Sequence, residues 1–346
     1  MTTENPAVAA RTSGDRMRDA GSSLLRVGGV FIVVLLVIAV FALLTGGKSL
    51  IPANLLGMLR AMSSVAILGM GLLLVIVVGE IDLSFGYLYG LSASTIAVSW
   101  IMWGWPIWAA IILAFAVAIF WGCFNAFFTT VVKIPSFIAT LGSGTLIFGF
   151  TLLITNTSTF NPAYPPAGKV VNPDELKLFT SLANQQLPFN FPMQGLWMIG
   201  IAIVVWFLLS RSLFGFRLKA IGGNPEAARL ARLPVRKYKF AAFIAMGLLA
   251  CTAAMLDFAF IGSTQPNAGI SFVFPTFAAV IIGGASLAGG RGSVAGTLTG
   301  ALLLAVLVNG LALLASGPFA TQMLFGTVTI GAVVLDRYTQ RKRGML

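Results

Sequence analysis

Histidine is absent from this chain of 346 residues, and acids are scarce, with 10 Asp and Glu against 22 Lys and Arg. The chain therefore lacks the commonest general base and an important transition-metal ligand. Its two cysteines, Cys123 and Cys251, both lie inside apolar runs, so we expect buried thiols rather than a disulfide or metal pair. These absences argue against an enzyme, a metal site or a resident cofactor.

Charge is also sparse, because only 9% of the residues are charged while 58% are hydrophobic, and the mean hydropathy is +0.95. Soluble domains carry about 25% charged residues. No soluble core could hide this much apolar surface, so the sequence predicts an all-α polytopic membrane protein. The net charge of +12 does not indicate nucleic-acid binding, because no soluble domain exists to present a basic face.

Apolar runs predict about ten membrane-spanning helices, several of which contain glycine. Their expected ranges are 27–46, 55–79, 83–103, 106–131, 135–155, 194–210, 239–262, 272–290, 293–315 and 318–336.

The distribution of basic residues predicts the orientation of these spans. With both termini in the cytoplasm, 18 of the 22 Lys and Arg fall on the cytoplasmic side, and this asymmetry fits an even number of spans. The expected organisation is a cytoplasmic tail at 1–26, a transmembrane domain at 27–336 and a second tail at 337–346. The polar start of the chain argues against a cleaved signal peptide. The four basic residues left outside are Lys48, Arg60, Lys169 and Lys177.

Two long loops interrupt the apolar pattern. The segment 156–194 is polar and rich in proline, and on this topology it lies outside, as a linker between halves or a docking surface. The segment 211–238 lies in the cytoplasm and contains a short helix signal, with Asn224 as N-cap, Pro225 at the first helical position and Glu226 in the first turn. A capped helix in a basic loop indicates a surface for a cytoplasmic partner.

An internal repeat predicts two related halves. VIVVGEIDLSFG at 75–86 aligns without gaps with AVIIGGASLAGG at 279–290, at an offset of 204 that pairs Gly79 with Gly283. Further along, Asn125 pairs with Asn309. Internal repeats are common in transporters, which place their path at the repeat interface.

Three acids are candidates for a translocation path or gate. Glu80 and Asp82 either line the inner part of a path or lie in a cytoplasmic turn, with their carboxylates in water. Asp257 lies in an apolar span, where an acid faces the protein interior more often than lipid. It is either a gate residue or the structural ion-pair partner of Arg60.

Uncharged polar and aromatic side chains would suit a neutral solute rich in hydroxyl groups. The alternative for each polar group is hydrogen bonding between helices. The path candidates, beside the three acids, are Phe85, Asn125, Phe137, Gln265, Asn267, Phe274 and Asn309, with Ser143, Thr145, Phe148, Thr151 and Thr297 as supporting groups.

Several motifs together resemble the permease subunits of ribose- and xylose-type ABC sugar importers. These are GEIDLSFG (79–86), KIPSFIATLG (133–142), AIGGNPEAARLA (220–231), QPNAG (265–269) and IIGGASLAGGRGSVAGTLTGALLL (281–304), which match in order and spacing over roughly residues 50–336. The chain departs from many relatives at Glu80, where a second glycine is usual and xylose-type members can carry an acid. It also departs at Phe85, Tyr87 and Tyr89, which are bulkier than usual.

The resemblance implies a permease dimer in the bacterial inner membrane, homomeric or heteromeric. It also implies a cytoplasmic ATPase with two nucleotide-binding domains and an external sugar-binding protein, with ATP and Mg²⁺ bound by the ATPase. The substrate would be a small sugar, with a pentose favoured over a hexose or polyol because of Glu80. The residues implied to couple to the ATPase are Gly222, Gly223, Asn224, Pro225, Glu226, Ala227, Ala228, Arg229 and Leu230.

The chain itself lacks a phosphate loop. The nearest match, GGKS at 46–49, has Ala42 where the motif needs glycine and follows no strand. We therefore expect a partner to hydrolyse ATP, and the permease to work by alternating access. The competing functions are an ion-coupled secondary transporter, which would use Asp257 with Glu80 or Asp82, and a passive channel or export permease.

Overall fold

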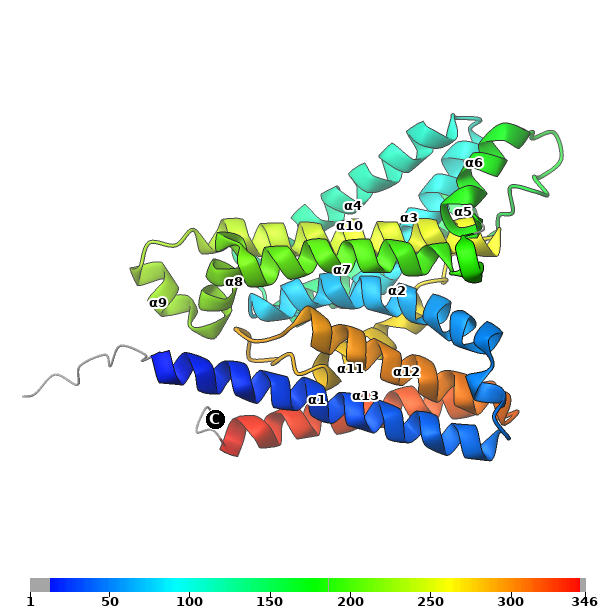
Figure 1. The fold of residues 1–346 in the computed structure, drawn as a ribbon. Helices are drawn as coiled ribbons and strands as arrows, with labels where there is room; N and C mark the ends of the chain where they lie inside the picture. The colour runs from blue at the N-terminus through cyan, green and yellow to red at the C-terminus, as the bar shows by residue number, and fades with distance from the viewer. Residues whose placement is uncertain (1–12, 186, 343–346) are drawn as a thin grey trace, which may run out of the picture.

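The computed structural model describes residues 13–185 and 187–342, and it confirms an all-α polytopic protein (Figure 1). The α-helices are α1 (Ser13–Leu44), α2 (Pro52–Val77), α3 (Phe85–Ala97), α4 (Ile107–Thr130), α5 (Ser136–Thr155), α6 (Pro173–Asn184), α7 (Met193–Arg211), α8 (Leu213–Gly223), α9 (Pro225–Leu230), α10 (Val235–Ile261), α11 (Val273–Ile282), α12 (Val294–Leu313) and α13 (Pro318–Lys342). A π-helical turn, Val98–Met102, extends α3.

Seven of these helical segments are long and apolar enough to cross a bilayer, and three shorter apolar helices accompany them. The shorter ones are Gly28–Leu44, Ile270–Ile282 and Pro318–Val334. Together the ten fall on the ten ranges expected from the sequence. Helix α1 begins at Ser13, so part of the expected N-terminal tail is helical, while residues 1–12 and 343–346 lie outside the described part of the chain.

Helices α2 and α3 form the centre of the bundle. In their most apolar windows, 83% and 89% of the residues are buried, against 33%, 28% and 33% in α4, α5 and α7. Helix α10 packs against α2, α3 and α4, and α12 packs against α1, α2 and α11. The peripheral helices keep apolar faces exposed, as expected of surfaces that meet lipid or another membrane subunit.

The two ends of the described chain lie on the same side of the bundle. The start of α1 and the end of α13 lie at the end that carries α8 and α9, and α6 lies at the opposite end (Figure 1). This arrangement agrees with an even number of crossings. It also separates the basic segment 211–238 from the proline-rich segment 156–194.

The segment 156–194 folds onto the bundle instead of forming a free linker. Helix α6 is capped at its start by Asn172, whose side chain accepts a hydrogen bond from the Asp174 amide at 2.9 Å. Glu175 accepts one from the indole of Trp100 at 2.8 Å. Phe179 is buried and meets Phe258 of α10 edge to face. The segment therefore closes the bundle at this end.

The repeat motifs end α2 and α11 with the same turn. In each turn a glycine in the left-handed region, at φ 86° for Gly79 and φ 88° for Gly284, donates its amide to the carbonyl three residues back at 2.9 Å. The turns thus pair Gly79 with Gly284 at an offset of 205, and the expected pairing with Gly283 is wrong by one residue. The eighth expected span, 272–290, is also too long, because this turn ends α11 at Ile282.

Candidate functional site

Helix α9 is the capped helix expected from the sequence. The Asn224 side chain accepts a hydrogen bond from the Ala227 amide at 3.0 Å, and Pro225 occupies the first turn. Glu226 lies in the first turn and Arg229 in the last, which complements the helix dipole. Only Ala228 is buried, and Leu230 is 87% exposed. The element thus projects from the bundle and presents a mostly open surface.

Gly222, in the last turn of α8 directly before α9, is wedged against the repeat turns. A Cβ added at Gly222 would lie 1.9 Å from the Val77 carbonyl oxygen and 2.7 Å from the Gly290 nitrogen. The Gly290 amide donates to the same Val77 carbonyl at 2.9 Å. Only glycine permits this approach. The base of α9 therefore touches the end of α2 and the 286–292 loop, which follows α11, at one point.

Between α2 and α3 the backbone of residues 79–84 is not helical and runs along α5. The amide of Ile81 donates to the Ser136 hydroxyl and that of Leu83 donates to Thr140, both at 3.0 Å. Irregular backbone inside a membrane protein needs such partners, because lipid supplies none. The hydroxyls lie four residues apart on one face of α5, so a single helix satisfies both amides.

Asp82 is buried at the start of a chain of polar groups. Its carboxylate accepts from the Ser84 amide at 2.7 Å and from the Ser84 hydroxyl at 2.6 Å. Asn125 of α4 donates to that hydroxyl at 2.7 Å and accepts from Ser143 of α5 at 2.5 Å. Burial raises the pKa of Asp82 to about 6, against a smaller opposing effect of the bonds from Ser84.

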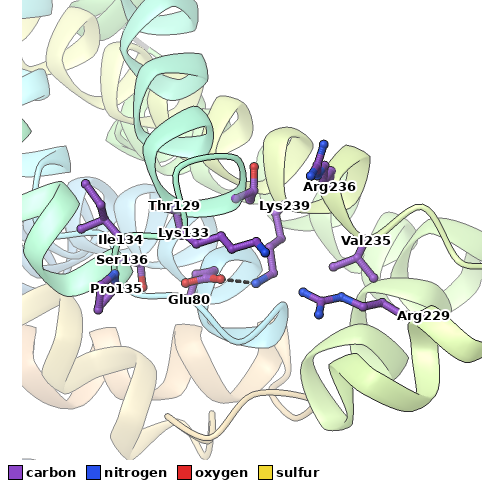
Figure 2. Close-up of a pocket in the computed structure, with 11 residues that line it drawn as sticks. Glu80, Thr129, Lys133, Ile134, Pro135, Ser136, Arg229, Val235, Arg236 and Lys239 are labelled. Carbon is purple, nitrogen blue, oxygen red and sulfur yellow. Dashed lines mark hydrogen bonds and ion pairs between the residues drawn. The ribbon is translucent and has the colours of Figure 1, made fainter.

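Glu80 forms an ion pair with Lys239 in the first turns of α10 (Figure 2). Its side chain is 10% exposed and Asp82 is 2% exposed, so the alternative that both carboxylates lie in water is wrong. The physical reason is that α4, α5, α9 and α10 enclose the segment. From the sequence, Lys239 is only one of the basic residues that predict a cytoplasmic loop.

Asp257 of α10 does not pair with Arg60. Its carboxylate accepts from the Ser64 hydroxyl of α2 at 2.7 Å and from the Tyr89 hydroxyl of α3 at 2.6 Å. Arg60 instead lies over the Phe260 ring, 4.4 Å from its centroid. Of the two alternatives for Asp257, the ion pair with Arg60 is wrong, because two neutral hydroxyls on other helices reach the carboxylate instead. Asp257 thus joins three helices of the core.

The loop after α10 packs against α3 through glycine. A Cβ at Gly90 would lie 2.6 Å from the Pro266 carbonyl oxygen, and one at Gly269 would lie 2.1 Å from the Gly86 carbonyl oxygen. Gln265 and Asn267 are exposed on this loop. The motif QPNAG is therefore a close contact between loop and helix, with its two amide side chains directed away from the core.

The other path candidates do not gather at one place. Phe85 is buried against Phe277 with ring centroids 6.2 Å apart, while Phe137 and Phe274 are 51% and 62% exposed. Asn309 exchanges amide hydrogen bonds of 2.8 and 2.9 Å with Asn54. Of the expected residues, the polar chain from Asp82 brings together Asp82, Asn125 and the supporting group Ser143.

Several polar side chains only bond to their own helix. The hydroxyls of Thr145, Thr151 and Thr297 donate to carbonyls three or four residues back in α5 and α12. Such bonds satisfy each hydroxyl within its own helix, so these hydroxyls need not line a translocation path.

Sequence analysis missed Tyr89 and Thr140 as partners of the candidate residues. The seven-residue spacing of Ser136, Thr140 and Ser143 on one helical face is a signal that could have revealed the α5 surface.

Comparison with known proteins gives the family. The family described as "Branched-chain amino acid transport system / permease component" matches residues 54–333. The xylose transport system permease protein XylH of Escherichia coli K12 is 31% identical over 364 aligned positions, covering 90% of this chain and 93% of that protein. The ribose import permease protein RbsC of Bacillus subtilis is 34% identical, covering 89% of this chain and 91% of that protein.

RbsC of Escherichia coli K12 is 35% identical, over 83% of this chain and 86% of that protein. No solved structure matches the chain significantly. The matched region includes the capped helix, both repeat turns and the α5 surface. The chain therefore belongs to this permease family, with the ribose- and xylose-type ABC transporter permeases, and is a multi-pass protein of the bacterial inner membrane.

Proposed function

We propose that this chain is the membrane subunit of an ATP-driven importer that moves a small sugar into the cytoplasm. Two of its relatives are named as xylose and ribose permeases, and both of these sugars are pentoses. We therefore favour a pentose, with a hexose or polyol as alternatives. The polar chain from Asp82 to Ser143 and the scarcity of acids both suit a neutral substrate.

The proposed partners are a cytoplasmic ATPase with two nucleotide-binding domains, an external sugar-binding protein and a second permease subunit. ATP and Mg²⁺ would bind the ATPase, since the sequence of this chain has no phosphate loop. The exposed helix α9 supports an ATPase contact on the side where both described chain ends lie (Figure 1). The binding protein would dock at the opposite end, where α6 closes the bundle.

The proposed mechanism is alternating access driven through α9. The observation that carries it is the contact of Gly222 with Val77 and Gly290, because displacement of α9 must also displace the end of α2 and the 286–292 loop. Closely packed contacts transmit such shifts since they do not deform continuously. Closure of the ATPase would thus tilt α2, α3 and α12 around the path.

The test is to recover the complex from membranes of the source cell. The tagged chain is solubilised in mild detergent, and the eluate is examined by mass spectrometry and for ATPase activity. The proposal expects an ATPase with two nucleotide-binding domains, whose activity rises when a sugar-loaded binding protein is added. The ligand of that binding protein then identifies the substrate.

Recovery of the chain alone under mild conditions would contradict the proposal. Uptake into liposomes driven by a proton or sodium gradient, without ATP, would replace it with ion-coupled transport.

A further inference from the structure

A cavity of about 430 Å³ lies beside α9, between the α4–α5 turn and the start of α10 (Figure 2). Its lining carries four basic residues, Lys133, Arg229, Arg236 and Lys239, and one acid, Glu80. Cavities that hold small ligands have volumes of roughly 300–1,000 Å³. The cavity is therefore large enough for a small ion or a headgroup, and its charge selects an anion.

Three of these cations, Lys133, Arg229 and Arg236, have no salt bridge to an acid among the described residues. Lys133 and Arg229 extend toward the Glu80–Lys239 pair from opposite sides, whereas Arg236 points away (Figure 2). Glu80 is the one acid among the described residues that line the cavity, and it pairs with Lys239, so it compensates a single positive charge. Like charges facing a partly enclosed cavity repel each other more strongly than in open water, and a bound anion would offset this repulsion.

Helix termini and hydroxyls add donors at the same place. Ser136 begins α5, which has 20 residues, and Val235 begins α10, which has 27; both line the cavity with the positive ends of their helices. The Thr129 hydroxyl also lies on the lining, and it has no hydrogen-bond partner in the described structure although the residue is only 8% exposed. Tetrahedral oxyanions match this mixture of cations, hydroxyls and helix N-termini.

We propose that this cavity binds a phosphate group, which bridges Arg229 of α9 and Lys133 of the α4–α5 turn. The guanidinium would hold two phosphate oxygens and the ammonium a third. The group would belong either to an anionic phospholipid or to soluble phosphate. Exposed Val131 and Val132 lie next to Lys133, so a lipid could approach from that side. The site goes beyond the proposed transport function, because nothing in sugar import requires it.

The first test uses the purified full chain in neutral detergent and inorganic phosphate as the probe. Phosphate is titrated against chloride at equal ionic strength while the melting temperature is followed. Wild type should be stabilised, and the double variant Lys133→Gln/Arg229→Gln should bind phosphate at least tenfold more weakly, which corresponds to about 1.4 kcal/mol. Lys237→Gln removes an exposed charge that does not line the cavity, so it is the matched control and should respond like wild type.

The second test separates the two sources. The chain is placed in nanodiscs of phosphatidylcholine alone or with one quarter phosphatidylglycerol, and native mass spectrometry counts the retained phosphatidylglycerol. A lipid source predicts retention and stabilisation by phosphatidylglycerol, with little further effect of phosphate. A soluble source predicts the reverse. Both effects should be absent from the double variant.

A charge-preserving variant guards against misfolding. Lys133→Arg/Arg229→Lys keeps the charges and should retain binding, so a loss confined to the glutamine variant is assigned to charge. The proposal is overturned if wild type responds to neither probe. It is also overturned if the glutamine double variant, eluting as a folded protein, responds as strongly as wild type.

Discussion

At the scale of single residues, the acids of this protein are held by neutral hydroxyl and amide groups more than by cations. Asp82 is held by Ser84, and Asp257 by Ser64 and Tyr89. Glu80, by contrast, pairs with the basic side chain of Lys239. Buried carboxylates with neutral partners retain part of their desolvation cost, so their protonation depends on burial.

Asp82 should therefore make stability depend on pH. Its pKa is raised to about 6 in the folded state, from the ordinary value of 3.8, so the folded protein binds a proton that the unfolded chain has lost between these values. Stability should rise as pH falls through 6 toward 4, and ionised Asp82 should cost about 3 kcal/mol above pH 6. In melting experiments, the Asp82→Asn variant should lack this gain in stability at low pH.

The readout is the difference in melting temperature between Asp82→Asn and wild type from pH 7.5 to pH 5. Relative to wild type, the variant should have its highest melting temperature at pH 7.5. This advantage should decrease as the pH falls to 5. Exposed Asp174→Asn is the control and should follow wild type. A difference that does not vary with pH would contradict the assignment.

The partners of Asp257 can be tested by double-mutant cycles. Tyr89→Phe combined with Asp257→Asn should show a coupling energy of about 1–2 kcal/mol, because the two side chains share a hydrogen bond of 2.6 Å. Arg60→Gln combined with Asp257→Asn should show coupling within about 0.5 kcal/mol of zero. The measurement is the free energy of unfolding in mixed micelles. Strong coupling to Arg60 alone would restore the ion pair expected from sequence.

At the scale of elements, α9 is a short helix joined rigidly to the bundle at its base. Six residues are too few for a helix to be stable by itself in water, so its cap and its packing hold it. Its outer surface stays open, while Gly222 fixes its base to α2 and the 286–292 loop. An element of this kind can transmit a displacement from a partner.

Gly222→Ala should disrupt that joint. The new Cβ would lie 1.9 Å from the Val77 carbonyl oxygen, so the backbone must shift, at a cost of about 1–3 kcal/mol. We expect a lower melting temperature and loss of ATP-dependent uptake in vesicles with the partner ATPase. Gly223→Ala is the matched control, since a Cβ there meets nothing within 4 Å. Equal effects at both positions would contradict the role of close packing.

Asn224→Ala should weaken α9 without unfolding the bundle. Loss of the hydrogen bond from the Ala227 amide costs about 1 kcal/mol and destabilises only the start of α9. We expect fewer sugar molecules transported per ATP hydrolysed, at nearly unchanged melting temperature. Asn224→Asp keeps a capping oxygen and should restore the ratio. Unchanged transport in Asn224→Ala would show that the cap does not contribute to coupling.

At the scale of the whole molecule, the two polar regions lie at opposite ends of an apolar bundle. Segment 211–238 lies with both described chain ends, and α6 closes the far end (Figure 1). The basic residues predict that the end carrying segment 211–238 faces the cytoplasm. The proposed ATPase and binding protein would then have separate surfaces.

Cysteine labelling can measure this sidedness. Leu230→Cys and Val170→Cys change residues that are 87% and 86% exposed at the two ends. A membrane-impermeant maleimide should label position 170 in spheroplasts and position 230 only in inside-out vesicles. Wild type, with buried Cys251 and partly buried Cys123, gives the background. The reverse pattern would invert the topology.

Sequence alone determined the class, the approximate position of the ten apolar segments and the capped helix at Asn224. These features depend on composition and on spacings of a few residues, so they can be read locally. The family resemblance also rested on linear motifs in a fixed order. Comparison with known permeases then confirmed that resemblance.

Only the tertiary structure decided which polar groups meet. Glu80 pairs with Lys239, which is 159 residues away in the sequence, and Asp257 bonds to Ser64, which is 193 residues away. Gly222 fits against Val77 only because α8 returns to the end of α2. Apolar membrane helices resemble one another in sequence, so local patterns do not specify their neighbours. Packing of small residues and pairing of buried polar groups across helices make that choice.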